Sequence, residues 1–164
     1  MIAFETFNFE IFIIFDLIHF PLKSTIMNTT KITVEKTINA DSKKVWDYWN
    51  QPEHITNWNF ANYDWCCPKA SNDLQVGGKL FTRMEATDGS FGFNFEGIYD
   101  EIVPQKKISY KITDGRNVTT TFENLGEKTK VTTVFDAENS NPIEMQRAGW
   151  QAILDNFKRY TENN

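Results

Sequence analysis

The chain has 164 residues, a mass of 19.1 kDa, a net charge of −5 and a pI near 5.1. This length fits one domain with a sizeable core. The acidic balance argues against nucleic acid as a partner, because neutralising phosphates needs a basic surface. Five Trp and fourteen Phe leave two explanations open, a large core or a core that also lines an apolar cavity.

The first 26 residues, MIAFETFNFEIFIIFDLIHFPLKSTI, are dominated by Phe and Ile but contain three acidic residues. A secretory signal needs a basic start and an uninterrupted apolar run, and a membrane span needs about 20 apolar residues; neither pattern is present. An interfacial helix, an accessory packed segment and an upstream extension remain as interpretations. Met27 begins MNTTKITVEKTI, so we predict that 1–26 is an extension and 27–164 the domain.

The domain opens with a predicted strand and two short helices. Polar and apolar residues alternate over residues 31–38, KITVEKTI, which predicts a strand. Asp41 then provides an N-cap for a helix that ends at Trp49. Pro52 suits the first position of a second short helix, PEHITNW.

Residues 59–73, NFANYDWCCPKASND, are rich in turn formers and predict an irregular loop. The loop contains the chain's two cysteines, Cys66 and Cys67. Neighbours in sequence rarely form a disulfide, and spaced Cys or His ligands are absent. We therefore expect structural thiols, no metal and no cofactor, in a reducing cytoplasm.

Five further strands are separated by turn signals at Asp88-Gly89, Pro104, Asp114-Gly115 and Gly126. We predict them at residues 79–87, 91–103, 107–113, 116–123 and 128–137. Their short links require antiparallel pairing. Together with the first strand they predict a sheet of about six strands.

The sequence ends in NPIEMQRAGWQAILDNFKRY, residues 141–160, which predict one long amphipathic helix with Asn141 as N-cap and Pro142 as its first residue. Its apolar side carries Ile143, Trp150, Ile153, Leu154, Phe157 and Tyr160. A sheet with one apolar face needs a cover. We therefore predict an α+β fold, a curved antiparallel sheet wrapped on this C-terminal helix.

This order of elements resembles the helix-grip fold of START-like, or Bet v 1-like, proteins. The opening strand and helices, VGGKLFTRMEATDG (76–89), FEGIYDEIVPQKKISY (95–110) and the closing Gly149-Trp150 resemble the activator of Hsp90 ATPase homologue 1-like (AHSA1-type) family of the START-like/SRPBCC superfamily. The resemblance covers residues 31–160 and implies an apolar cavity between helix and sheet. The superfamily includes lipid carriers, hormone receptors and cyclases, so the resemblance does not define an activity. The eukaryotic co-chaperone has a separate Hsp90-binding domain, and we expect no Hsp90 function here.

Large apolar side chains from the helices and strands are the candidate lining of that cavity: Trp46, Trp49, Trp58, Met84, Phe93, Met145, Trp150 and Leu154. Such walls suit a hydrophobic or amphipathic small molecule. The alternative is that the rings fill the space themselves. Trp150→Ala is predicted to cost about 3–5 kcal/mol if the ring belongs to the core, whereas lost ligand uptake at nearly unchanged stability would indicate a cavity wall.

Two charged residues, Arg83 and Glu96, lie within otherwise apolar strands and are the polar candidates. Alternation in the strand does not determine which face meets the helix. An inward Arg83 would need Glu96 as its partner, and the pair could orient a ligand carboxylate or carbonyl. The alternative is a solvated face. No partner for His54 as a general base is visible, so a surface histidine is expected.

Three functions therefore compete. We expect a small-molecule binding protein without catalytic residues. One alternative is a protein-interaction or co-chaperone-like module that uses a sheet face or residues 59–73. The other is a cyclase- or hydrolase-like enzyme, in which Arg83, Glu96 or His54 would have to converge.

Overall fold

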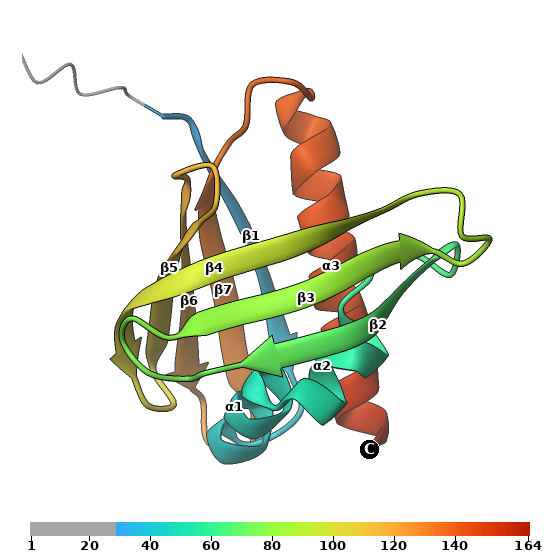
Figure 1. Ribbon diagram of the computed structural model, residues 1–164. Coiled ribbons are helices and arrows are strands. Elements are labelled where there is room, and N and C mark those ends of the chain that lie inside the picture. The colour runs from blue at the N-terminus through green and yellow to red at the C-terminus, as the bar shows by residue number, and fades with distance from the viewer. Residues whose placement is uncertain (1–28) are drawn as a thin grey trace, which may run out of the picture.

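The computed structural model describes residues 29–164, so the predicted division between residues 26 and 27 lies outside the described residues. The elements are β1 (Lys31–Ile38), α1 (Ser42–Asn50), α2 (Pro52–Trp58), β2 (Trp65–Asn72), β3 (Lys79–Ala86), β4 (Gly92–Val103), β5 (Lys107–Ile112), β6 (Asn117–Asn124), β7 (Thr129–Asp136) and α3 (Ile143–Asn163). The strands form one antiparallel sheet in the order β1-β7-β6-β5-β4-β3-β2. The sheet curls around α3, with α1 and α2 near the C-terminal end of that helix (Figure 1). The predicted helix-grip architecture is confirmed.

The sheet has seven strands where the sequence predicted about six, because β2 replaces part of the expected irregular loop. β2 is an edge strand that pairs with β3, and its register shifts between Cys66 and Lys69. Pro68 lies in this bulge, where a residue without an N–H is tolerated. Because this segment is rich in turn-forming residues, its strand was not predicted from the sequence.

The two short helices are confirmed in detail. The carboxylate of Asp41 accepts a hydrogen bond from the backbone N–H of Lys44 at 2.9 Å and caps α1. Pro52 is the first residue of α2. The predicted cap of α3 is wrong: its N-cap is Pro142 without a side-chain hydrogen bond, and Asn141 lies in the preceding turn.

The core lies between the C-terminal half of α3 and the sheet. Phe157 is fully buried, and its ring meets the rings of Trp49 and Trp58 edge-on, with centroids 4.8 and 4.9 Å apart. Trp49 also meets Phe122 edge-on at 5.6 Å. The buried residues of α3 all come from its second half: Leu154, Asn156, Phe157 and Thr161. The first half therefore borders a less tightly filled region.

α3 also runs along the edge of the sheet formed by β1. Arg147 Nη1, Gln151 Nε2 and Lys158 Nζ donate hydrogen bonds to alternate backbone carbonyls of β1, those of Thr33, Glu35 and Thr37, at 3.1, 3.3 and 2.7 Å. The other edge of β1 pairs with β7. The helix therefore supplies donors to a strand edge that would otherwise lack partners.

Asp136 connects three strands through one carboxylate. It accepts hydrogen bonds from Lys31 Nζ at 2.7 Å and from the backbone N–H and side-chain amide of Asn117 at 2.9 and 2.8 Å. Its side chain is only 5% exposed. Burial alone would raise the pKa of Asp136, but these hydrogen bonds outweigh it and hold the pKa below its usual 3.8.

The lowered pKa makes the contribution of Asp136 dependent on pH. A carboxyl group with a lower pKa in the folded state stabilises the fold above its unfolded pKa, and this stabilisation is lost as the pH falls through the folded pKa. Asp136→Asn is expected to lower the free energy of unfolding by about 1–3 kcal/mol at neutral pH. In urea titrations the difference from the natural chain should shrink below about pH 4.

Asp100, exposed on β4, provides the control, because Asp100→Asn should change the free energy of unfolding by less than about 0.5 kcal/mol. An Asp136→Asn deficit that stays constant down to pH 2 would contradict the assignment.

Candidate functional site: a cavity between α3 and the sheet

A cavity of about 320 Å³ lies between the first half of α3 and the curled sheet. Side chains from all three helices and from β1, β3, β4, β5 and β7 line it. This volume falls at the lower end of the range for small-molecule sites, about 300–1,000 Å³. Two of the lining residues, Phe93 and Asn141, are exposed, so the cavity reaches solvent there.

The apolar walls come mainly from aromatic residues. Of the eight predicted lining side chains, six border the cavity, namely Trp49, Trp58, Met84, Phe93, Trp150 and Leu154. Trp46 instead packs in the core, edge-on to Phe122 at 5.3 Å. Met145 is 62% exposed and does not line the cavity. It lies beside the apolar stripe of α3 and not on it. Contact with a ligand stays a prediction for the six.

Trp150 connects the helix to the sheet at this cavity. Its ring stacks on Phe135 with centroids 4.1 Å apart and planes 16° from parallel, and it meets Phe95 edge-on at 6.1 Å. Phe135 is buried. The indole is thus packed against β7 while it borders the cavity, which holds a large flat wall in place.

The strand face that sequence alternation left open is now defined. Leu80, Thr82 and Met84 of β3 line the cavity, so Arg83 lies on the opposite face. Arg83 Nε donates to Glu85 at 2.7 Å and its Nη1 donates to Asn94 at 3.2 Å.

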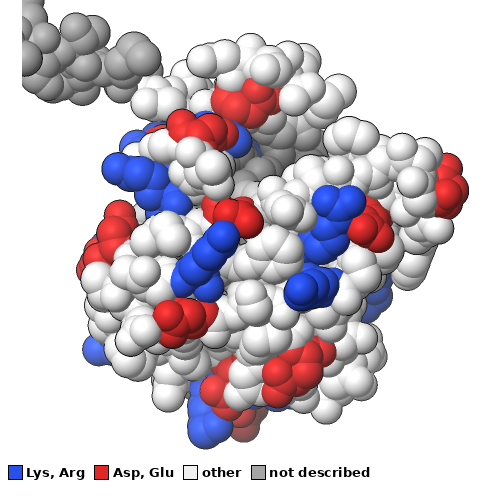
Figure 2. All heavy atoms as spheres, in the orientation of Figure 1, with Lys and Arg blue, Asp and Glu red and all other residues white. Residues whose placement is uncertain are grey.

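Glu96, the other polar candidate, pairs with Lys79 at 2.6 Å on the outer face of the sheet. Figure 2 shows acidic and basic side chains interspersed on the face it displays. His54 contacts the hydroxyl of Tyr160 at 2.9 Å and stacks on Tyr48. Arg83, Glu96 and His54 therefore do not converge on a common point.

Sequence reasoning missed the polar side chains that do line the cavity. Arg116 and Glu138 come from the segments before β6 and after β7, and Gln146 from the first turns of α3. The Glu138 carboxylate accepts hydrogen bonds from the backbone N–H groups of Ser140 and Asn141. These bonds, that from Ser140 foremost, hold the pKa of Glu138 below its usual value.

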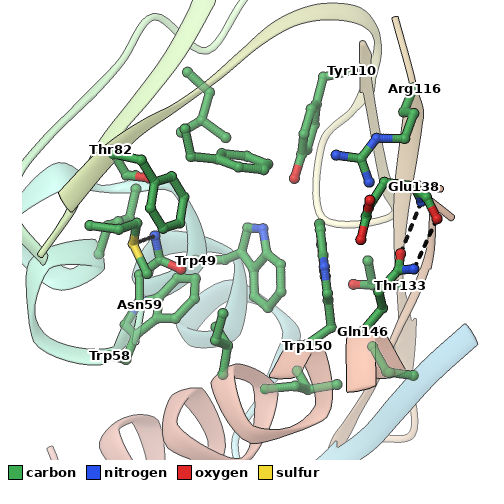
Figure 3. A pocket seen from close by; sticks show the side chains of 18 of the residues that line it. Trp49, Trp58, Asn59, Thr82, Tyr110, Arg116, Thr133, Glu138, Gln146 and Trp150 are labelled. Carbon is green, nitrogen blue, oxygen red and sulfur yellow. Dashed lines mark hydrogen bonds between the residues drawn. The ribbon is translucent and has the colours of Figure 1, made fainter. Parts of the chain in front are cut away.

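Arg116 is the cation at this end of the cavity. Its Nε and Nη2 contact the carboxylate of Asp114 at 2.8 and 2.7 Å, and its Nη1 lies 3.4 Å from the carbonyl of Asp136. In Figure 3 the guanidinium of Arg116 and the carboxylate of Glu138 lie near each other at one side of the pocket. No ion pair within 4.0 Å joins these two described residues.

Tyr110 of β5 contributes a phenol whose hydroxyl points into the cavity (Figure 3). Its ring is buried, which raises the pKa of Tyr110, so the hydroxyl stays a neutral donor. It forms no hydrogen bond with any residue in the range 29–164. The neighbouring Tyr99, by contrast, donates to Asn72 Oδ1 at 2.9 Å.

The position of Tyr110 depends on Gly97 in β4. A Cβ added to Gly97 would lie 2.6 Å from Cδ2 of Tyr110, so the ring would have to shift. Gly97→Ala is expected to lower the free energy of unfolding by about 1–3 kcal/mol through overpacking. Gly149→Ala in α3 is the matched control: its Cβ meets nothing within 4 Å, and it should stabilise the helix by about 0.5–1 kcal/mol. Equal effects of the two changes in urea titrations would contradict the role of Gly97.

The cysteines are thiols outside the cavity. Cys67 is 2% exposed, and burial raises its pKa to about 11, which disfavours a reactive thiolate. Among residues 29–164 no group of three metal-ligating side chains is close enough to hold an ion. Within the same range, no helix has the length and apolar character needed to cross a bilayer.

A curled antiparallel sheet, a long C-terminal helix held against it and a cavity between them define a helix-grip protein of the START-like class. Residues 39–162 match the family described as "Activator of Hsp90 ATPase homolog 1-like protein". The chain belongs to this family.

Solved structures of other proteins have a similar fold. An AHSA1-like protein from Aeromonas hydrophila is 42% identical, with a TM-score of 0.77 and 82% of this chain and 93% of that chain covered. The protein Chr148 from Cytophaga hutchinsonii is 50% identical, with a TM-score of 0.71 and the same coverage. The Aha1 protein from Colwellia psychrerythraea, solved as a dimer, shares the fold at 14% identity, with a TM-score of 0.64 and coverage of 81% and 96%. A comparison with curated proteins finds no match.

Proposed function

We propose that this protein binds a small apolar or amphipathic molecule in the cavity between α3 and the sheet, without covalent chemistry. The observation that carries the proposal is the cavity itself, about 320 Å³ in volume and walled by Trp49, Trp58, Trp150 and other aromatic residues. Protein interiors normally pack without such voids. An unfilled apolar space that reaches solvent is what a binding site for a hydrophobic molecule requires.

Native mass spectrometry of the protein purified from its own host tests this proposal. A retained molecule, released on unfolding, is the expected result. In parallel, the neutral fluorescent probe N-phenyl-1-naphthylamine should bind the emptied protein at a ratio of one to one. The absence of both a retained molecule and saturable probe binding would overturn the proposal.

A protein-interaction module is the second candidate, and one surface feature favours it. Trp65 forms a cluster with Phe91 and Phe93, with ring centroids 6.1 and 5.9 Å from its own. Phe91 is 61% exposed and Phe93 41%, and exposed aromatic clusters are typical of contact surfaces. This candidate predicts that the neutral probe does not bind, and that Phe91→Ser releases a protein that otherwise co-purifies with the chain.

We further propose a cytoplasmic location. Cys66 and Cys67 are both free thiols, as is usual for proteins of reducing compartments. Fractionation of host cells would test this assignment.

A further inference from the structure

The polar end of the cavity holds three side chains that can form hydrogen bonds with a ligand: Tyr110, Arg116 and Glu138. The hydroxyl of Tyr110 has no partner within residues 29–164. Contacts with Asp114 and the carbonyl of Asp136 occupy three of the five N–H groups of Arg116. The Glu138 carboxylate accepts the backbone N–H groups of Ser140 and Asn141, and the side chains of the same two residues also help to lower its pKa.

These groups come from three separate segments of the chain, yet they face the same space. Figure 3 shows the hydroxyl of Tyr110, the guanidinium of Arg116 and the carboxylate of Glu138 around one side of the pocket, beside the indole of Trp150. Tyr110 is only 6% exposed. Its hydroxyl borders the cavity, where a ligand group or water can accept its proton. The geometry therefore leaves a place for one polar group of a ligand.

The charged side chains at the polar end of the cavity determine which polar group of a ligand fits there. Asp114 and Glu138 both have lowered pKa values, in each case mainly through hydrogen bonds, from Arg116 and from Ser140 respectively. At neutral pH the cation of Arg116 is therefore already paired with Asp114, which lies outside the cavity lining, and the carboxylate of Glu138 lines the cavity as an anion. A ligand carboxylate beside Arg116 would also face Glu138, and two like charges at close range repel each other.

A hydroxyl group avoids this repulsion. It accepts a hydrogen bond from Arg116 or Tyr110 and donates one to Glu138, because a hydroxyl has one donor and two acceptor positions. We infer that the natural ligand is an apolar molecule that ends in a neutral hydroxyl group, held between Tyr110, Arg116 and Glu138. This inference rests on the proposed binding function and specifies the chemistry of its ligand.

Three probes of one shape separate the possibilities: biphenyl, 4-hydroxybiphenyl and biphenyl-4-carboxylate. Each is titrated into the full chain at pH 7.5, with quenching of tryptophan fluorescence and calorimetry as readouts. 4-Hydroxybiphenyl is expected to bind about 10-fold more tightly than either other probe, since it forms hydrogen bonds to charged groups without like-charge repulsion.

Two substitutions locate the preference. Tyr110→Phe removes one hydroxyl and should weaken 4-hydroxybiphenyl about 3- to 10-fold while leaving biphenyl unchanged. Glu138→Gln removes the negative charge and should narrow the gap between the carboxylate and hydroxyl probes. The matched controls are Tyr63→Phe and Glu123→Gln, because both residues are exposed and neither lines the cavity; they should change no affinity.

The results distinguish a failure of the hydroxyl preference from a failure of the binding function itself. If biphenyl binds but the hydroxyl gives no advantage, or if the carboxylate binds as tightly as the hydroxyl, the inference is overturned and the binding function stands. The same holds if Tyr110→Phe folds, as judged by circular dichroism, and keeps the full preference. If none of the three probes nor N-phenyl-1-naphthylamine binds, both the binding function and the inference are overturned.

Discussion

Replacement of Phe157 by alanine is expected to lower the free energy of unfolding by about 3–5 kcal/mol. Phe157 is fully buried at the centre of the contact between α3 and the two short helices, where its ring touches those of Trp49 and Trp58. Its removal loses transfer free energy and leaves a void that rigid aromatic neighbours cannot fill. Equilibrium unfolding in urea, monitored by tryptophan fluorescence, measures the change.

The same substitution at an exposed phenylalanine provides the control. Phe91 is 61% exposed at the start of the β4 region, and Phe91→Ala should change the free energy of unfolding by less than about 1 kcal/mol. A comparable loss at both positions would mean that α3 is not held by the packing around Phe157.

Trp150→Ala is expected to weaken binding of N-phenyl-1-naphthylamine more than 10-fold, because it removes the large flat wall that α3 presents to the cavity. The free energy of unfolding should fall by about 2 kcal/mol. This loss is smaller than that for Phe157, because the indole is packed against Phe135 and Phe95 but also borders unfilled space. Probe titration and urea unfolding of the same preparation measure the two effects.

Trp46→Phe is the matched control for binding. Trp46 is buried but does not line the cavity, so this substitution should leave the probe affinity unchanged. Trp150→Ala with unchanged probe affinity would show that the probe binds elsewhere.

Local patterns were sufficient for most of the fold. Asp41 and Pro52 carry the start signals of α1 and α2 in their own side chains, and alternation over KITVEKTI matches β1 residue for residue. β2 was not predicted because its Pro68 and polar residues are typical of turns. Its strand conformation depends on pairing with β3, a contact that only the tertiary fold provides.

The candidate site could be predicted only in its apolar part. Trp150 and Leu154 lie on the periodic stripe of α3, so helical spacing placed them against the sheet. Arg116 begins one predicted strand and Glu138 follows the end of another, positions that do not mark a cavity, and the curl of the sheet brings them to the same place. Arg83 was a candidate because both faces of its strand carry apolar residues, and alternation alone does not tell which face is covered.

The row of hydrogen bonds from Arg147, Gln151 and Lys158 to alternate carbonyls of β1 has a consequence for how copies of this chain can associate. An incoming strand would have to displace all three donors before it could pair with β1. At the opposite edge of the sheet, the bulge and the proline of β2 interrupt the backbone hydrogen-bonding pattern that an added strand would need. Within the described residues, self-assembly by strand addition is therefore disfavoured at both edges of the sheet.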